Sequence, residues 1–326
     1  MSIRRRGLRL FAIALFAACA TPAAAQDYPA RVVRLVVPFA PAGSTDIYAR
    51  ILAKELNAAW GQAVVVENRP GATGLIGTDL VKRAAADGYT LLFTSNTAHV
   101  LGPLLQKTRP FDAVADFTPI SKALRFLLYL VVHPSLPVRS VKEFIAFGRA
   151  RPGQLVFASS GQGGTSHLVA ELFNQVGGIK AVHVPYKGTS PALTGLMSGE
   201  THYLFNNIGV SQPLVVSGRL RGLAITGERR MPALPEVPTM SELGIKGLES
   251  AYTWLGLLAP ASLPPAVAAK LSAEAIRIMR TPEMEKRIVN DGYLPVANTA
   301  DEFRKELQAE VVTWSKVVRD SGIKAD

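Results

Sequence analysis

Residues 36–46, VVPFAPAGSTD, decide the fold of the amino-terminal half of the chain. They end an apolar, β-branched run over residues 32–37, which predicts a strand. Two prolines and Gly43 then break the chain, and apolar residues next recur at helical spacing from about Ser44. The sequence therefore predicts a strand that passes through a tight turn into a helix.

This turn presents the first N–H groups of the predicted helix. Those groups have no partner within the helix and lie at the positive end of its dipole, so they can hold an anion without a charged side chain. A structural alternative is that Ser44 or Thr45 caps the helix and Asp46 pairs with Arg50 one turn later. The stretch alone leaves both interpretations open, because every helix must begin somewhere.

A similar pattern continues along the first third of the chain. Residues 63–93 predict a second strand, a glycine-rich turn, a helix and a third strand. Strands that alternate with helices favour a parallel α/β sheet, in which the loops at the carboxyl ends of the strands gather at one edge. We therefore expect the turns at Pro41, Gly71 and Ser95 to converge.

The same order of elements restarts after Ser121. An apolar strand is expected over residues 128–132, and a later strand runs into residues 159–167, SSGQGGTSH, before another helix. This is again a strand, a Gly/Ser turn and a helix N-terminus. Two such turns in two similar α/β halves predict a cleft with an anion held between them.

The carboxyl-terminal part of the chain predicts three helices, which we expect to pack back onto the first half. The chain would then cross between the halves twice, near Ser121 and Gly247, an arrangement that suits a hinge. The predicted divisions are a signal peptide over residues 1–25, a first domain over residues 26–122 and 248–326, and a second domain over residues 123–247.

The first 25 residues predict export. Four arginines precede a short apolar run, and the small residues 23–25 offer a cleavage site, as in a secretory signal peptide. We expect cleavage near Ala25 and a periplasmic mature protein, with lipid attachment at Cys19 as an alternative. Since Cys19 is the one cysteine of the chain, no disulfide and no cysteine metal site is expected after cleavage.

Length and charge limit the classes of function. The 326 residues are 48% hydrophobic and 19% charged, which predicts a large core and two domains. Without the four leader arginines, 32 basic residues face 25 acidic ones, a net charge of +7. These charges are dispersed and not interleaved with aromatic residues, so nucleic-acid binding is not expected. A mild positive field favours the capture of small anions instead.

The sequence supports two enzymatic interpretations less well than it supports anion binding. A serine hydrolase would need a nucleophile elbow, but Ser160 is not in a G-x-S-x-G motif, and His167 lies at a helical spacing that points away from it. The glycines at 71, 74 and 77 resemble a dinucleotide-binding turn, yet they follow the second strand with four residues intervening. We expect these glycines to allow close approach of backbone amides to a ligand.

The histidines lack the spacing of metal ligands, so no metal site is predicted. They are scattered along the chain at His99, His133, His167, His183 and His202. Each is expected to be a structural histidine.

An ordered series of short motifs lies at residues 37–46, 67–72, 87–91, 116–120, 183–188 and 238–240. Each motif is weak alone, but their order is specific, and they cover essentially the whole mature chain. The series resembles the Bug family, the periplasmic solute-binding proteins of tripartite tricarboxylate transporters.

The resemblance implies a two-lobed Venus-flytrap fold with two hinge crossings, no enzymatic activity and no cofactor. It implies that a small carboxylate, such as a di- or tricarboxylate, an acidic amino acid or an aromatic acid, is captured in the interdomain cleft. The partners would be two integral membrane transporter subunits, and we expect a monomer. A ligand-sensing partner of a membrane receptor, or an exported dinucleotide-dependent or serine enzyme, remains an alternative.

The family's ligand-binding positions carry over to residues of both predicted domains. The first domain would contribute Phe39, Ala42, Ser44, Thr45, Asp46, Gly71, Ala72, Thr73, Ser95 and Asn96. The second would contribute Ser160, Gly164, Thr165, His167, Asn206 and Asn207. Ala42 and Thr73 depart from the glycines that the family usually has there, so Ala42 is expected to narrow the pocket or disfavour a positive φ, and Thr73 to offer a hydroxyl.

Overall fold

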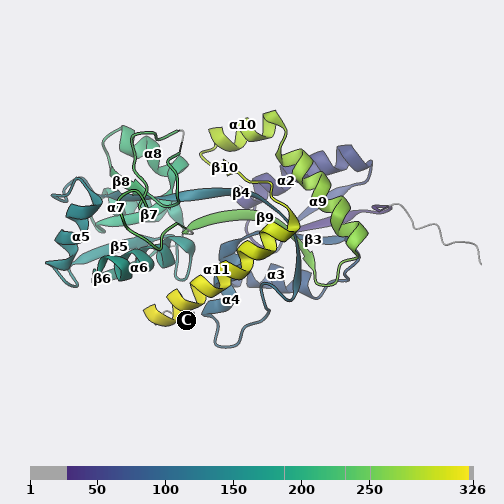
Figure 1. The fold of residues 1–326 in the computed structure, drawn as a ribbon, viewed down its shortest axis with the longest axis horizontal. Helices are drawn as coiled ribbons and strands as arrows, with labels where there is room; N and C mark the ends of the chain where they lie inside the picture. The colour runs from purple at the N-terminus through teal and green to yellow at the C-terminus, as the bar shows by residue number, and fades with distance from the viewer. Residues whose placement is uncertain (1–27, 187, 232, 250, 323–326) are drawn as a thin grey trace, which may run out of the picture.

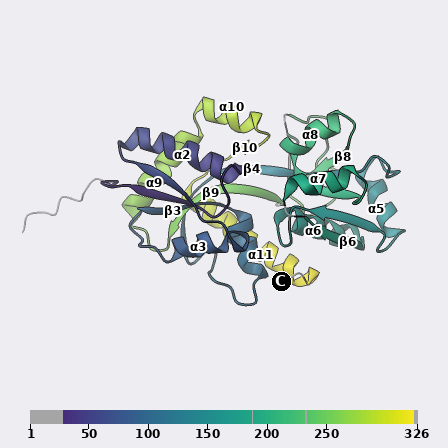
Figure 2. The ribbon, with the colours of Figure 1, turned by 180° about the vertical axis from the view of Figure 1, so that it is seen from behind.

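The computed structural model describes residues 28–322 except 187, 232 and 250. Two α/β lobes lie side by side and are joined by the long strands β4 (Phe117–Val132) and β9 (Tyr252–Pro260) (Figures 1 and 2). This confirms the predicted two-lobed fold with two chain crossings. The predicted signal peptide, with Cys19 and the cleavage site near Ala25, lies outside the described residues.

The first lobe is built on one half of a ten-stranded sheet. Its other strands are β1 (Val33–Val37), β2 (Val64–Asn68), β3 (Thr90–Ser95) and β10 (Leu294–Pro295). β2, β1 and β3 are parallel, as predicted, but β9 is antiparallel to β3, and β4 is antiparallel to β9. The parallel arrangement thus holds for the first three strands, and the sheet as a whole is mixed, because β4 and β9 are not linked to their neighbours by the crossover helices that parallel pairs require.

Helices cover both faces of this half-sheet. Along β1, Leu35 and Val37 join one apolar cluster and Val36 joins another, as the period of two in a strand requires. On the first face lie α2 (Ser44–Trp60), α9 (Pro265–Met279) and α10 (Pro282–Asn290); on the second lie α3 (Leu75–Lys82), α4 (Gly102–Leu105) and α11 (Ala300–Ser321). Two short segments, η1 (Ala72–Gly74) and η2 (Thr97–Leu101), complete the lobe. The three carboxyl-terminal helices thus pack back onto the first lobe, as predicted.

The second lobe repeats the design. Its strands are β5 (Leu155–Ser159), β6 (Ala181–Pro185), β7 (Tyr203–Asn207) and β8 (Arg221–Ile225). Its helices are α5 (Val141–Arg149), α6 (Thr165–Gly177), α7 (Thr189–Met197) and α8 (Ile208–Val216). The sequence did not predict α8, because Gly209 and Pro213 interrupt it.

Strand β4 belongs to both halves of the sheet. It pairs with β9 as far as Leu127 and with β7 from Leu128 onward. The sequence predicted a strand only over residues 128–132, since the polar Ser121 and Lys122 interrupt the apolar pattern. In the fold both are buried, and Lys122 is paired with carboxylates of α11.

Candidate ligand-binding cleft

A cavity of about 520 Å³ lies between the lobes. It is lined by Phe39, Gly43, Ser44, Thr45, Ser95, Thr97, Phe126, Leu128, Ser160, Gly164, Thr165, Ser166, Thr189, Ser190, Asn206, Asn207, Val210, Thr253, Leu255 and Tyr293. Hydroxyls, amides and apolar groups make up this lining, and none of the described residues that form it has a charged side chain. The donors that these described residues offer to an anion are therefore neutral groups and helix N-termini.

The wall of the first lobe is the turn that leads into α2. Gly43 precedes the helix, and no side chain caps it, so the alternative that Ser44 or Thr45 caps the helix is wrong. The N–H groups of the first turn are thus left without a side-chain acceptor, while Ser44 and Thr45 line the cavity. The predicted pair of Asp46 with Arg50 is confirmed, with a separation of 2.9 Å.

Asp46 holds this turn from behind. One carboxylate oxygen accepts the N–H of Ala42 at 2.9 Å, and the other accepts the side-chain amide of Asn68 at 2.9 Å. Burial opposes the charge, but hydrogen bonds from Arg50, Ala42 and Asn68 keep the pKa of Asp46 below its usual range. The turn needs this support because Ala42 has a φ of 67°, in the left-handed region that favours glycine.

The wall of the second lobe is the turn that leads into α6. Its N-cap is Gly164, again without a side-chain cap, and the Ser160 N–H donates to the Ser166 hydroxyl at 3.0 Å. A side chain at Gly163 would collide with Leu105 of the first lobe, so the backbone approaches the opposite lobe closely here. The two predicted strand–turn–helix sites therefore face the same cavity.

Helices α7 and α8 also begin at this cavity. Thr189 and Ser190 of α7 line it, and so does Asn207, the N-cap of α8. Thr189 and Ser190 are not among the predicted site residues. The strand–turn–helix pattern that identified the first two turns recurs at Gly188 and could have found them.

Aromatic rings form one side of the cavity. Phe39 follows β1, Phe126 lies on β4, and Tyr293 precedes β10. The rings of Phe126 and Tyr293 lie 5.1 Å apart. Burial raises the pKa of Tyr293, although hydrogen bonds with the side chains of Asn207 and Ser44 oppose the shift. Tyr293 thus joins the two lobes at the cavity, a role that its local sequence does not signal.

The lobes also touch directly on two sides of the cavity. The hydroxyls of Thr97 and Thr165 lie 2.8 Å apart across the cleft. On another side, a Cβ added at Gly209 of α8 would lie 2.8 Å from the carbonyl oxygen of Asp291 in the first lobe. Contacts of this kind depend on how far the lobes are closed.

Nine of the sixteen predicted site residues line the cavity, and seven do not. Asp46 and His167 are buried behind it, and Asn96 is buried with its side-chain amide on the carbonyl oxygen of Tyr252, at 2.9 Å. The others that do not line the cavity are Ala42, Gly71, Ala72 and Thr73, which are exposed. Ala72 and Thr73 have φ values of 47° and 54°, so the turn holds two strained residues beside Gly71.

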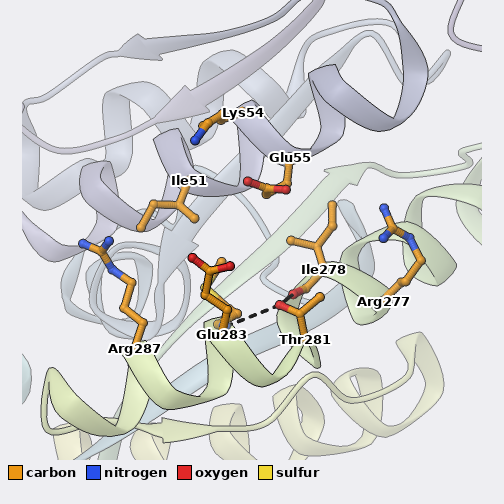
Figure 3. Close-up of a pocket in the computed structure, with 9 residues that line it drawn as sticks. Ile51, Lys54, Glu55, Arg277, Ile278, Thr281, Glu283 and Arg287 are labelled. Carbon is orange, nitrogen blue, oxygen red and sulfur yellow. Dashed lines mark hydrogen bonds between the residues drawn. The ribbon is translucent and has the colours of Figure 1, made fainter.

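A second, smaller cavity of about 240 Å³ lies between α2, α9 and α10 (Figure 3). Charged side chains of both signs surround it, among them Lys54, Glu55, Glu283 and Arg287. The Thr281 hydroxyl donates to the carbonyl oxygen of Ile278 and accepts the N–H of Met284, which caps α10. Both hydrogen bonds are made within the protein. Two of its cations, Arg277 and Arg287, are paired with Glu274 and Asp291, and two carboxylates also line it, so the interlobe cavity is the better candidate for an anion.

The geometry gives no support for catalysis by Ser160 and His167. The Ser160 hydroxyl lies 2.9 Å from that of Ser166, while Nδ1 of His167 accepts the N–H of Gly163. Within the described residues, no group of three His, Cys, Asp or Glu side chains is arranged to hold a metal ion. In the same part of the chain, no helix is long and apolar enough to cross a membrane.

A two-lobed α/β fold with a donor-rich cleft between the lobes defines a solute-binding protein. Residues 48–323 match the tripartite tricarboxylate transporter family receptor, and the chain belongs to this family. It is 38% identical to Protein BugT of Bordetella pertussis over 309 residues, 94% of each chain. The family assignment confirms the predicted resemblance.

Solved structures are similar over nearly the whole chain. Rpa4515 of R. palustris with adipate has 34% identity and a TM-score of 0.79, covering 91% of this chain and 99% of that one. MatC from Rhodopseudomonas palustris with bound malate has 30% identity and a TM-score of 0.75, covering 89% and 100%. The periplasmic binding protein BugD also has 30% identity and a TM-score of 0.75, covering 92% and 100%.

Proposed function

We propose that this protein captures a small carboxylate in the interlobe cavity and closes its two lobes around it. The observation that carries the proposal is the pair of uncapped helix N-termini, α2 and α6, which reach the cavity from opposite lobes. Each offers backbone N–H groups and the positive end of a helix dipole to an anion. A ligand held by both would stabilise the closed form.

Neutral donors suit such a ligand. Hydrogen bonds to an ionised group are stronger than those between neutral groups, and they strengthen further when water is excluded. The rings of Phe39, Phe126 and Tyr293 would pack against an apolar part of the ligand. The relatives with adipate and malate are consistent with a di- or tricarboxylate, and an acidic amino acid or aromatic acid also fits these groups.

The setting of this activity is part of the same proposal. The mature protein would act as a monomer in the periplasm, without enzymatic activity or cofactor, and deliver its ligand to two integral membrane subunits of a tripartite transporter. The lobes that close would be residues 26–122 with 248–326, and residues 123–247. The family description and the periplasmic relative BugD support this assignment.

A thermal-shift screen tests the ligand class. At about a hundred times its dissociation constant, a bound carboxylate should stabilise the protein by roughly 2.7 kcal/mol. Adipate, malate, glutamate and benzoate are suitable probes, with adipamide as an uncharged control for adipate. Thr165→Val should reduce the shift, since it removes a cavity hydroxyl while keeping the shape of the side chain. A shift with a nucleotide and with no acid would contradict the proposal.

A further inference from the structure

A side cavity of about 320 Å³ adjoins the interlobe cavity. It lies between α2 and α10 of the first lobe and α8 of the second. Ser44, Asn207, Val210 and Tyr293 line both cavities, so the two spaces share a wall. The rest of the side cavity is lined by Ile47, Tyr48, Gly209, Arg287 and Asp291.

The ring of Tyr293 stands between the two cavities. It lies 5.1 Å from the ring of Phe126, which lines the interlobe cavity, and 5.8 Å from the ring of Tyr48, which lines the side cavity. Tyr48 follows Ser44 by about one helical turn of α2, a rise of about 5 Å. The side cavity therefore leads away from the N-terminus of α2, along the helix and past Tyr293.

Apolar groups from both lobes face the side cavity. Ile47 of α2 is 39% exposed and Val210 of α8 is 47% exposed, although both are large hydrophobic residues. Together with the ring of Tyr293, they could cover the methylene groups of a ligand that extends out of the interlobe cavity. Each methylene that is fully buried in this way would raise the affinity by up to about fourfold.

The side cavity also contains a positive charge, which the described lining of the interlobe cavity lacks. Arg287 extends from α10 toward α2 (Figure 3). Its Nε lies 3.7 Å from Oδ2 of Asp291, which is longer than a hydrogen bond. Among the described residues, the guanidinium makes no hydrogen bond. It can therefore offer a carboxylate two parallel hydrogen bonds.

Asp291 limits the strength of this site. Its Oδ2 accepts the hydroxyl of Tyr48 at 2.7 Å, and its charge would repel an anion bound at Arg287. Arg287 is also about half exposed, so water screens its charge. A second carboxylate would therefore gain a modest amount of affinity here, enough to discriminate between ligands of similar structure.

We propose that the side cavity is a subsite for the far end of an extended dicarboxylate, and that Arg287 selects such ligands by binding their second carboxylate. The first carboxylate would lie at the N-termini of α2 and α6, and the carbon chain would pass Tyr293. This inference rests on the proposed function and deepens it, since it assigns the ligand a length and two charged ends.

Calorimetry at neutral pH with suberate and octanoate tests the role of Arg287. The two ligands have equally long carbon chains, but octanoate lacks the second carboxylate. Arg287→Gln should bind suberate about fivefold less tightly than the wild type does, as expected for a half-exposed charge pair, and should bind octanoate equally well. Asp291→Asn should instead bind suberate more tightly, because it removes the competing charge while its Oδ1 can still accept the Tyr48 hydroxyl.

Arg277→Gln is the matched control. Arg277 is exposed to a similar degree and is paired with Glu274, but it lines the cavity of Figure 3 and not the side cavity. This variant should leave the affinity for suberate and for octanoate unchanged. Succinate, whose short chain would stay in the interlobe cavity, should also bind equally to the wild type and to Arg287→Gln, and it replaces octanoate if that acid binds too weakly to measure.

Three outcomes would overturn the inference while leaving the proposed function intact. They are an unchanged affinity of Arg287→Gln for suberate, an equal loss for suberate and for the acid that cannot reach Arg287, and a wild-type protein that binds succinate or adipate but not suberate. A wild-type protein that binds none of these acids, nor any other carboxylate of the thermal-shift screen, would contradict the proposed function itself.

Discussion

At the scale of single residues, the shape of the cleft depends on side chains that do not line its cavity. Asp46 is the clearest case: it was predicted as a ligand contact, but it is buried and binds the Ala42 N–H, Arg50 and Asn68. These bonds hold a turn whose Ala42 has a positive φ, so the carboxylate compensates for the absence of glycine there. A change at Asp46 should alter binding through the shape of the turn.

Asp46→Ala is expected to leave the protein folded but to lower its free energy of unfolding by about 1–3 kcal/mol at neutral pH, and to weaken carboxylate binding. Since the folded pKa of Asp46 lies below the ordinary value of about 3.9, its stabilisation is present above that pH and is lost as the pH falls through the folded pKa. Urea unfolding at neutral and acid pH measures both effects.

Asp79→Ala is the control for this change. Asp79 also pairs with an arginine four residues later, but through a surface ion pair with Arg83, 2.8 Å away, that should contribute less than about 1 kcal/mol. Equal losses for the two variants would show that Asp46 has no special role in the turn.

At the scale of elements, four helices of the described part of the chain begin at the cavity, and their N-termini approach it from both lobes. The start of α8 also meets the end of α10, where a Cβ at Gly292 would lie 3.0 Å from Cα of Gly209. Two glycines in contact leave no room for a side chain between the lobes. How closely α8 and α10 approach therefore limits how far the cleft can close.

Gly209→Val is expected to hold the lobes apart and reduce the affinity for a carboxylate by about tenfold or more, because closing the cleft would force its side chain against Asp291. Gly209→Ala should have a smaller effect of the same sign. Calorimetry gives the affinity, and small-angle X-ray scattering gives the degree of closure with ligand. Val216→Ala, at the exposed far end of α8, is the control and should bind normally. Unchanged affinity in the valine variant would exclude this contact as a limit on closure.

At the scale of the whole molecule, α11 lies against both lobes and against β4, one of the two strands that join them (Figure 1). Nζ of Lys122, on β4, lies 2.5 Å from Oε2 of Glu306 and 3.5 Å from Oε1 of Glu310, both on α11. Nε1 of Trp254, on β9, donates to Glu310 at 2.7 Å. The two connecting strands are thus tied to one helix by a buried charged cluster.

Lys122→Met is expected to lower the free energy of unfolding by about 3–5 kcal/mol, because it leaves the buried Glu310 without its cation. Burial opposes the charge on Lys122, but Glu310 and Glu306 keep its pKa above the ordinary value. Its stabilisation is therefore present below about pH 10.4 and declines as the pH rises through the folded pKa. Urea unfolding from neutral to alkaline pH measures this.

Lys316→Met tests the same change on the exposed face of α11. Lys316 is paired with Asp320 at 2.6 Å but is largely exposed, so the substitution should cost less than about 1 kcal/mol. Similar losses for the two lysines would mean that the buried cluster adds nothing beyond an ordinary surface pair.

The sequence by itself determined the local structure around the cleft. Both strand–turn–helix segments, at Ser44 and Thr165, follow from apolar periodicity broken by glycine, and this signal needs no information from distant residues. The motif series likewise predicted the family, because the order of motifs is a property of the chain alone.

Only the tertiary structure decided which groups meet. In the fold, Asp46 and His167 accept backbone N–H groups of the turns before α2 and α6. Thr97, Phe126 and Tyr293 line the cavity, although the sequence did not predict them there. The direction and length of β4 also depend on the tertiary structure. Its Lys122 can be buried in a strand because α11 supplies carboxylates that pair with it. The physical reason is that burial, charge pairing and contact across the cleft depend on residues far apart in the chain, such as Lys122 and Glu310, which local patterns do not encode.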